Sequence, residues 1–270
     1  MCIAGYTLRD DMKAAAAFLL VLCYLAVSQA WNCKEAPQQY PALQIDAGQG
    51  KVVLTDKNHN AYFLSGSTWY RLGSYSLKHV SVGPAGIWGV DTSNKVYKYV
   101  AGNFLLSNGP SMLQVDAGGN GQVVGVSNSY TNYCLRSTFA SAYRKVGSLT
   151  WNSLSRVVKY YSCGPLYGCW GVDASDRIYF TQRIIPTTCG TSGWTQISGS
   201  AKMVEVGTDG TVFTVNRQGL VFQRTGIYNG RPQGSGWTQV SMCMKINHVS
   251  YDLGNLWAVT TSGLLFQCTH

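Results

Sequence analysis

The sequence predicts an all-β fold: a six-bladed β-propeller, in which six copies of one four-stranded sheet unit close into a ring. Three observations predict it. A short motif recurs six times, a strand-like segment follows each copy at a spacing typical of propeller blades, and strands of alternating apolar and polar residues come next. After the first thirty residues, no helical period competes with this interpretation.

The recurring motif is a polar residue, one spacer and then usually Gly, and it marks the first strand of each unit. Its six copies are Asp46-Ala47-Gly48, Ser81-Val82-Gly83, Asp116-Ala117-Gly118, Ser162-Cys163-Gly164, Glu205-Val206-Gly207 and Ser250-Tyr251-Asp252. The second strands end at Thr55, Val90, Val126, Val172, Val215 and Val259. These ends are separated by 35, 36, 46, 43 and 44 residues, close to the length of a four-stranded blade.

A tight polar turn separates the second strand from the third. Such turns are clear at residues 91–94, 173–176, 216–219 and 260–263. Asp and Asn favour them because their side chains bond the nearby backbone, and Gly accepts a positive φ. A fourth strand opens on an aromatic residue in five units, at Trp69, Phe104, Trp151, Trp194 and Trp237.

The sixth unit has no fourth strand of its own, because the chain ends two residues after Cys268. The segment that begins with Trp31-Asn32-Cys33 has the missing pattern, so we expect it to supply the outer strand of the last blade. This closure would remove the open sheet edges. A Cys33–Cys268 disulfide would then lock the ring where the two chain ends meet.

Residues 1–30 are expected to be a signal peptide and residues 31–270 one secreted propeller domain. Lys13 precedes a 14-residue apolar run, which is too short for the ~20 residues that span a membrane, and small residues follow. The net charge of +9 persists without this segment, since it holds two basic and two acidic residues. A basic extracellular surface favours anionic envelope lipids or acidic glycans over nucleic acid.

Seven cysteines remain after the signal, and in an exported chain most should form disulfides. Cys163 and Cys169 flank a short hairpin loop and would face each other. Cys134 and Cys189 fall in neighbouring blades and would join them, although seven cysteines allow other pairings. Cys243 is left over, which makes a covalent homodimer conceivable.

The Trp170-Gly171-Val172-Asp173 turn, followed by Ile178-Tyr179, resembles the tectonin repeat. From residue 31 to residue 270 the sequence resembles the fish-egg lectins, most closely at residues 79–86 and 160–173. This resemblance implies a six-bladed propeller that recognises N-acetylglucosamine or galactose-type sugars and bacterial lipopolysaccharide, in egg or innate defence. The family's even cysteine set would leave Cys243 without a counterpart. No cofactor is expected, and the sequence does not support a calcium site.

The acidic residues argue against an enzyme. A glycosidase needs two carboxylates that face one bond, but Asp46 matches Asp116 and Asp91 matches Asp173 in the repeat, which indicates structural roles. No Gly-x-Ser-x-Gly nucleophile elbow occurs. The four histidines have no metal-ligand spacing: His59, His79, His248 and His270.

Sugar binding needs an aromatic face and a few placed polar groups. The turn between the second and third strands lies at the same end of a blade as the passage to the next blade, so turn residues could share a groove with a segment such as Gly73-Ser74-Tyr75. The candidate carbohydrate-binding residues are Asp91, Asn94, Lys95, Asp173, Asp176, Arg177, Asn216 and Arg217. Several weak grooves on one ring would give avidity.

Other interpretations stay open. Turn chemistry alone explains Asp and Asn at these positions, and inter-blade packing explains the tryptophans that end the second strands, Trp88, Trp170 and Trp257. The chain could instead be a secreted scaffold that holds another protein, or a glycan hydrolase that uses Asp91 or Asp173.

Overall fold

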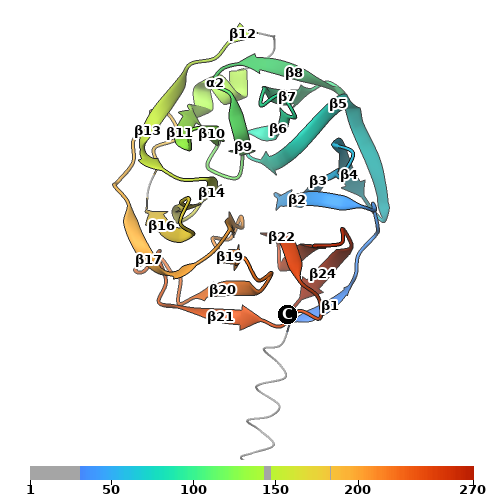
Figure 1. Ribbon diagram of the computed structural model, residues 1–270. Helices are drawn as coiled ribbons and strands as arrows, with labels where there is room; N and C mark the ends of the chain where they lie inside the picture. The colour runs from blue at the N-terminus through green and yellow to red at the C-terminus, as the bar shows by residue number, and fades with distance from the viewer. Residues whose placement is uncertain (1–30, 143–146, 183) are drawn as a thin grey trace, which may run out of the picture.

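The computed structural model describes residues 31–142, 147–182 and 184–270, and nearly every regular element in them is a β-strand. The predicted signal peptide lies outside the described residues. Figure 1 shows the strands as groups arranged around a central axis, with the first strand of each group nearest the axis and the last at the rim. The all-β propeller fold is therefore confirmed.

Each sequence repeat forms a group of four antiparallel strands, which we call a blade. Blade 1 comprises β2 (Ala42–Gly48), β3 (Lys51–Asp56), β4 (Asn60–Ser65) and the first part of β5 (Thr68–Gly83). Blade 2 comprises the rest of β5, β6 (Gly86–Asp91), β7 (Val96–Val100) and β8 (Asn103–Asn108). Blade 3 comprises β9 (Met112–Asp116), β10 (Val123–Ser127), β11 (Thr131–Leu135) and β13 (Trp151–Val157).

The second half of the chain repeats the order. Blade 4 comprises β14 (Tyr160–Gly164), β15 (Gly168–Val172), β16 (Arg177–Thr181) and β17 (Thr195–Ser200). Blade 5 comprises β18 (Met203–Val206), β19 (Val212–Val215), β20 (Val221–Thr225) and β21 (Gly236–Val240). Blade 6 comprises β22 (Ile246–Asp252), β23 (Asn255–Thr260), β24 (Leu265–Thr269) and β1 (Asn32–Glu35).

The N-terminal strand β1 thus belongs to the same sheet as the C-terminal strand. β1 runs antiparallel to β24 with Cys33 opposite Cys268, and a disulfide joins these two residues. β1 lies beside β24 at the rim, close to the C-terminus (Figure 1). The first and last described strands therefore hold each other in place.

A backbone hydrogen bond links each blade to the next, and it starts from the turn between the second and third strands. The fourth residue of every turn has a left-handed φ, between 62° and 102°. Its carbonyl accepts, at 2.6–3.2 Å, a backbone N–H that lies at the start of the next blade's inner strand or two residues before it. The six donor–acceptor pairs are Leu77–His59, Met112–Asn94, Val158–Tyr130, Ala201–Asp176, Ile246–Gly219 and Ala42–Gly263.

The recurring motif forms a second set of links around the axis. Its polar side chain accepts the N–H of the motif's middle residue in the following blade. The bonds that follow this pattern run from the N–H of Val82 to Asp46, Ala117 to Ser81, Cys163 to Asp116, Val206 to Ser162 and Ala47 to Ser250. The motif's Gly is needed for close approach, because a Cβ at Gly48, Gly83 or Gly118 would overlap the carbonyl of the next inner strand.

The polar side chains alternate around the ring. Blades 1, 3 and 5 contribute carboxylic acids and blades 2, 4 and 6 contribute serines at the motif's first position. The Ser162 hydroxyl lies within hydrogen-bond distance of both Asp116 (3.2 Å) and Glu205 (3.1 Å) and donates its single proton to one of them at a time. Two residues earlier, the even blades place His79, Tyr160 and His248, whose rings meet with centroids 5.9–6.3 Å apart. The two histidines occupy equivalent positions in blades 2 and 6 and are both buried, so they serve packing rather than contact with solvent.

We call these buried acids, serines and rings around the axis the axial cluster. Burial shifts the pKa values of its titratable groups. Burial raises the pKa of Asp46 to about 6 and, together with the neighbouring Asp46 carboxyl, that of Asp116 to about 8. The pKa of Glu205 is raised well above its usual range for the same reasons. Burial lowers the pKa of His79 to about 3 and that of His248 well below its usual value.

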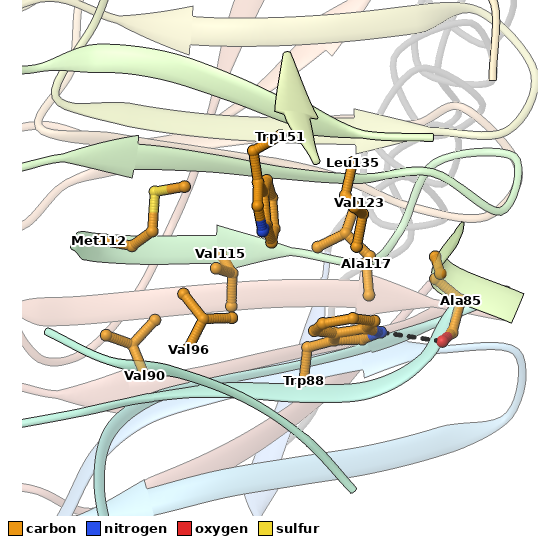
Figure 2. Close-up of a cluster of buried hydrophobic side chains, with 11 residues drawn as sticks. Ala85, Trp88, Val90, Val96, Met112, Val115, Ala117, Val123, Leu135 and Trp151 are labelled. Atoms are coloured by element: carbon orange, nitrogen blue, oxygen red, sulfur yellow. Dashed lines mark hydrogen bonds between the residues drawn. The ribbon is translucent and has the colours of Figure 1, made fainter. Parts of the chain in front are cut away.

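Apolar side chains fill the space between neighbouring sheets. Figure 2 shows Trp88 of blade 2 and Trp151 of blade 3 in one such cluster, and their rings meet edge to face with centroids 6.4 Å apart. Trp88 Nε1 donates to Ala85 O at 2.9 Å, so its polar atom is satisfied inside the core. Trp88, Trp170 and Trp257 are all buried, in accord with packing between blades.

Blade 3 departs from the repeat pattern. The expectation of no helix is wrong here, because α2 (Ser137–Ala142) and the short strand β12 (Gly147–Ser148) are inserted between β11 and β13. Ala140 of α2 is buried against blades 2 and 3, and its carbonyl accepts from Lys98. The helix thus adds packing at one junction and leaves the order of the blades intact.

The remaining disulfides connect the expected cysteines. Cys163–Cys169 closes the β14–β15 hairpin, and Cys134–Cys189 joins blade 3 to the long loop of blade 4. Among the described cysteines, Cys243 is in no disulfide and is exposed.

Replacing Cys33 and Cys268 with Ser should destabilise the protein more than replacing Cys163 and Cys169. The first disulfide spans 235 residues and the second spans 6. Chain entropy then predicts a loss of ~5 kcal/mol for the first and ~2 kcal/mol for the second. Urea unfolding monitored by Trp fluorescence would measure both; equal losses would contradict the ring-closing role of β1.

Stability should fall as pH rises from 6.5 to 8, and Asp116→Asn should reduce this fall. Folded Asp116 keeps its proton to about pH 8, whereas the unfolded chain loses it near 3.8, so the folded state binds more protons in this window. One proton corresponds to ~1.4 kcal/mol per pH unit. Below pH 6.5 the dependence becomes weaker, because His79 and His248 protonate only on unfolding and oppose the effect of the buried acids.

Urea unfolding at half-unit pH steps would test this dependence. The exposed Asp209, replaced with Asn, is the matched control and should leave the slope unchanged. Identical slopes for Asp116→Asn and the unmodified protein would mean that the axial acids do not govern the pH dependence.

Candidate functional site

The blades present two different ends. We call the end with the turns between second and third strands, where the chain also passes to the next blade, the turn face. The opposite end, where first and second strands and third and fourth strands are joined, is the loop face. All eight predicted sugar-binding residues lie on the turn face, next to the inter-blade passages as expected.

Three of these residues hold their own turns. Asp91 Oδ1 accepts the backbone N–H of Ser93 and of Lys95, both at 2.8 Å. Asp173 Oδ1 does the same for residues 175 and 177, and Asn216 Oδ1 for residues 218 and 220. The Oδ1 atoms of these three residues therefore stabilise the turns, as the turn-structure interpretation of these residues predicts.

Charged side chains gather where the turns of blades 4 and 5 meet. The two carboxylate oxygens of Asp176 accept from Lys159 and from Arg217 of the neighbouring turn. Asp173 Oδ2 accepts from Arg177 Nε at 2.7 Å. Burial raises the pKa of Asp173, but hydrogen bonds from Arg177 and Ser175 outweigh it and hold this pKa below its usual value.

The turn of blade 2 is built in the same way but carries an aromatic pair. Lys78 donates to Asn94 Oδ1, as Lys159 does to Asp176 in blade 4. Tyr97 OH donates to Asp91 Oδ2 at 3.0 Å, and Tyr75 stacks on Tyr97 with a centroid distance of 4.8 Å. The predicted neighbourhood of Asp91 and the segment at residues 73–75 is therefore present.

A hollow of about 310 Å³ lies between blades 4 and 5 toward the turn face, and we call it the 4/5 groove. Its lining residues are Ile178, Gly199, Ser200, Thr214, Asn216, Phe222 and Trp237. Asn216 is the predicted residue that reaches it. Trp237 Nε1 donates to Ser198 O at 2.8 Å, and the Arg224 guanidinium lies 4.9 Å from the Trp237 ring centroid, so the indole is fixed from two sides.

The 4/5 groove is mostly apolar and has a few polar groups. Phe222 and the partly exposed Trp237 supply aromatic surface, and Ser200 and Asn216 are lining residues that are polar and at least partly exposed. This combination suits a pyranose, whose ring has an apolar face and a rim of hydroxyls. Sequence reasoning placed Trp237 in a structural column. In the structure its ring lies beside Gly199, whose missing side chain leaves the ring uncovered, and no sequence pattern marks this neighbour.

Larger hollows lie at the loop face. One of about 770 Å³ is bordered by Trp31, Asp209 and Gln239, and one of about 530 Å³ is bordered by Gln122, Gln182 and Asn229. Tyr167, on the hairpin closed by Cys163–Cys169, lines both. None of these residues was predicted, because long loops from different blades build these hollows and no repeat pattern marks them.

Among the described residues, no group of three or more His, Cys, Asp or Glu side chains is placed to hold a metal ion. Within that same part of the chain, no helix has the length and apolar character needed to cross a membrane.

Solved structures of low sequence identity share the fold. Virginiamycin B lyase from Staphylococcus aureus aligns with a TM-score of 0.57 and 12% identity over 89% of this chain and 99% of that chain. YCF48 bound to D1 peptide aligns with a TM-score of 0.54 and 11% identity over 90% and 96%. Yeast RCC1 (Prp20) aligns at 0.54 and 8% over 83% and 68%. These likenesses show the fold alone.

Two curated proteins are similar in sequence. The fish-egg lectin of Cyprinus carpio is 40% identical over 157 residues, which cover 57% of this chain and 65% of the lectin, just under two thirds of its length. The perivitellin-2 31 kDa subunit of Pomacea maculata is 27% identical over 245 residues, covering 71% of this chain and 84% of that subunit. Residues 41–261 match the Tectonin domain. That match spans most of the propeller, and the chain therefore belongs to the tectonin domain family.

Proposed function

We propose that this chain is a secreted, non-catalytic carbohydrate-binding protein, a lectin, that holds sugars in grooves between its blades. The observation that supports it best is the 4/5 groove, which Trp237 and Phe222 line together with the polar residues Ser200 and Asn216. Family membership and the likeness to the carp fish-egg lectin support the same function. The predicted signal peptide and the three disulfides support secretion.

The turn residues would have two kinds of role. Asp91, Asp173 and Asn216 position the turns through Oδ1, and Asp176 positions Lys159 and Arg217 with both of its oxygens. The other predicted residues present polar groups beside the grooves: Asn94, Lys95, Arg177 and Arg217. We propose that these side chains bind sugar hydroxyls or anionic substituents, with N-acetylglucosamine or galactose-type sugars as ligands.

A hydrolytic function is less well supported than binding. A glycosidase needs a carboxylic acid of raised pKa facing a second carboxylate, but the pKa of Asp173 is lowered. The acids of raised pKa are Asp46, Asp116 and Glu205, which are 5–7% exposed and hydrogen-bonded between blades. A polysaccharide could not reach them without opening the ring.

Filling the 4/5 groove should remove one sugar site. Ser200 is exposed at its edge, so Ser200→Trp should occupy the groove without disturbing the core. We expect at least a tenfold weaker affinity for N-acetylglucosamine or galactose at this site, or one bound sugar fewer, as measured by isothermal titration calorimetry.

The matched control is Gln196→Trp, an exposed position on the same strand that does not line the groove. It should bind as the unmodified protein does. Normal binding by Ser200→Trp would assign the sugar to another groove. If the unmodified protein binds no sugar at all, the lectin function is wrong and the scaffold function becomes the better explanation.

Binding to bacterial lipopolysaccharide, in egg or innate defence, would draw on the basic turn face. Replacing both Arg177 and Arg217 with Ala removes two exposed charges there. Lipopolysaccharide affinity should fall, and more so at 20 mM than at 300 mM salt, because salt screens exposed charges. Surface plasmon resonance on immobilised lipopolysaccharide would measure this; an unchanged affinity at both salt concentrations would exclude the turn-face arginines.

A further inference from the structure

The loop face carries a hollow whose chemistry differs from that of the turn face. It measures about 530 Å³ and lies over blades 3, 4 and 5, and we call it the amide hollow. Four carboxamide side chains line it: Asn120, Gln122, Gln182 and Asn229. None of its described lining residues is charged, although the chain has a net charge of +9.

One of these carboxamides has an oxygen that is free to accept a hydrogen bond from a ligand. Gln122 is only 3% exposed, and its Oε1 has no hydrogen-bond partner among the residues that the structure describes. A buried acceptor without a partner is unfavourable. A hydroxyl or amide N–H of a bound molecule would satisfy it, as would a bound water.

An aromatic ring stands beside the carboxamides on a rigid support. Tyr167 lines the hollow from the β14–β15 hairpin, which the Cys163–Cys169 disulfide closes. On its other side the ring lies against Gly210, where a Cβ would overlap it. Tyr167 is therefore held in place before any ligand arrives, which lowers the entropic cost of binding.

We propose that the amide hollow is a second sugar site, selective for neutral sugars, and that one ring can therefore bridge two glycans. The proposal rests on the lectin function. Uncharged amide donors and acceptors beside an aromatic ring match the hydroxyl and acetamido groups of a neutral sugar. Antiparallel blades place this hollow and the 4/5 groove at opposite ends of the sheets, so two bound glycans would point away from each other.

Sites on opposite faces act differently from sites on one face. Several sites on one face increase avidity for a single surface. Sites on opposite faces allow a monomer to join two surfaces, and no covalent dimer through Cys243 is needed. Because the lining is uncharged, binding in the amide hollow should vary little with salt, unlike binding to the basic turn face.

The experiment uses a Cys243→Ser background, which removes the disulfide-dimer route, and size-exclusion chromatography with light scattering to establish that the protein is a monomer. Asn229 is exposed in a loop, so Asn229→Trp should fill the hollow without loss of folding. Asn103→Trp is the matched control, an exposed asparagine on the rim that lines neither hollow. The probes are free N-acetylglucosamine and galactose in native mass spectrometry, and agarose beads that carry the same sugars.

We expect Asn229→Trp to bind one sugar fewer, to remain on the sugar beads, and to require at least tenfold more protein to agglutinate them. Asn103→Trp should behave as the background protein does. Unchanged stoichiometry and agglutination in Asn229→Trp, together with a site lost in Ser200→Trp, would overturn the second site and leave the lectin function standing. No sugar bound by the background protein would instead overturn the lectin function itself.

Discussion

The ring depends on one repeated backbone contact: the carbonyl of the left-handed fourth residue of each turn accepts a backbone N–H at or just before the start of the next blade's inner strand. The left-handed conformation turns this carbonyl away from its own hairpin, so it can accept a hydrogen bond from the neighbouring blade. The same contact joins Gly263 of blade 6 to Ala42 of blade 1. Contacts between apolar faces alone would hold two sheets together, but they would not fix the position of one sheet relative to its neighbour along the axis of the ring.

The axial cluster adds directional bonds at the cost of burying acids. Odd blades contribute Asp46, Asp116 and Glu205, and the serines of even blades lie between them. Ionised carboxylates are unfavourable in such a place, and this is why the pKa values of these acids rise. Each retained proton lets a buried acid donate as well as accept. The arrangement stabilises a unique register around the ring but makes stability depend on pH.

Structure and binding compete for the same turn residues. An aspartate that caps a turn keeps one oxygen for the backbone, and Asp176 uses both oxygens for Lys159 and Arg217. Ligand contacts would then come from exposed side chains at the turns, or from surface that takes no part in the turn hydrogen bonds. The 4/5 groove is of this second kind, because it forms where the Gly199 position leaves the Trp237 ring uncovered. Loop-face hollows owe even less to the repeat, since loops of unequal length build them.

The sequence by itself determined the repeat, the strand order within a unit and the partnership of the two chain ends. Those features follow from local rules: alternation for strands, Asp and Gly for turns, and a missing outer strand that only β1 could supply. The cysteine partners followed from the same frame. Helix α2 was missed because six residues are too few to show a helical period.

Only the tertiary structure decided which turn oxygens are occupied and where hollows lie. Gln122 and Tyr167 come from different blades, and nothing in their spacing indicates that they share a hollow. Likewise, Trp237 reads as core from its column, yet its exposure depends on the residue that faces it across the groove. A local pattern specifies a strand, whereas a binding surface depends on which side chains remain uncovered after the blades have packed.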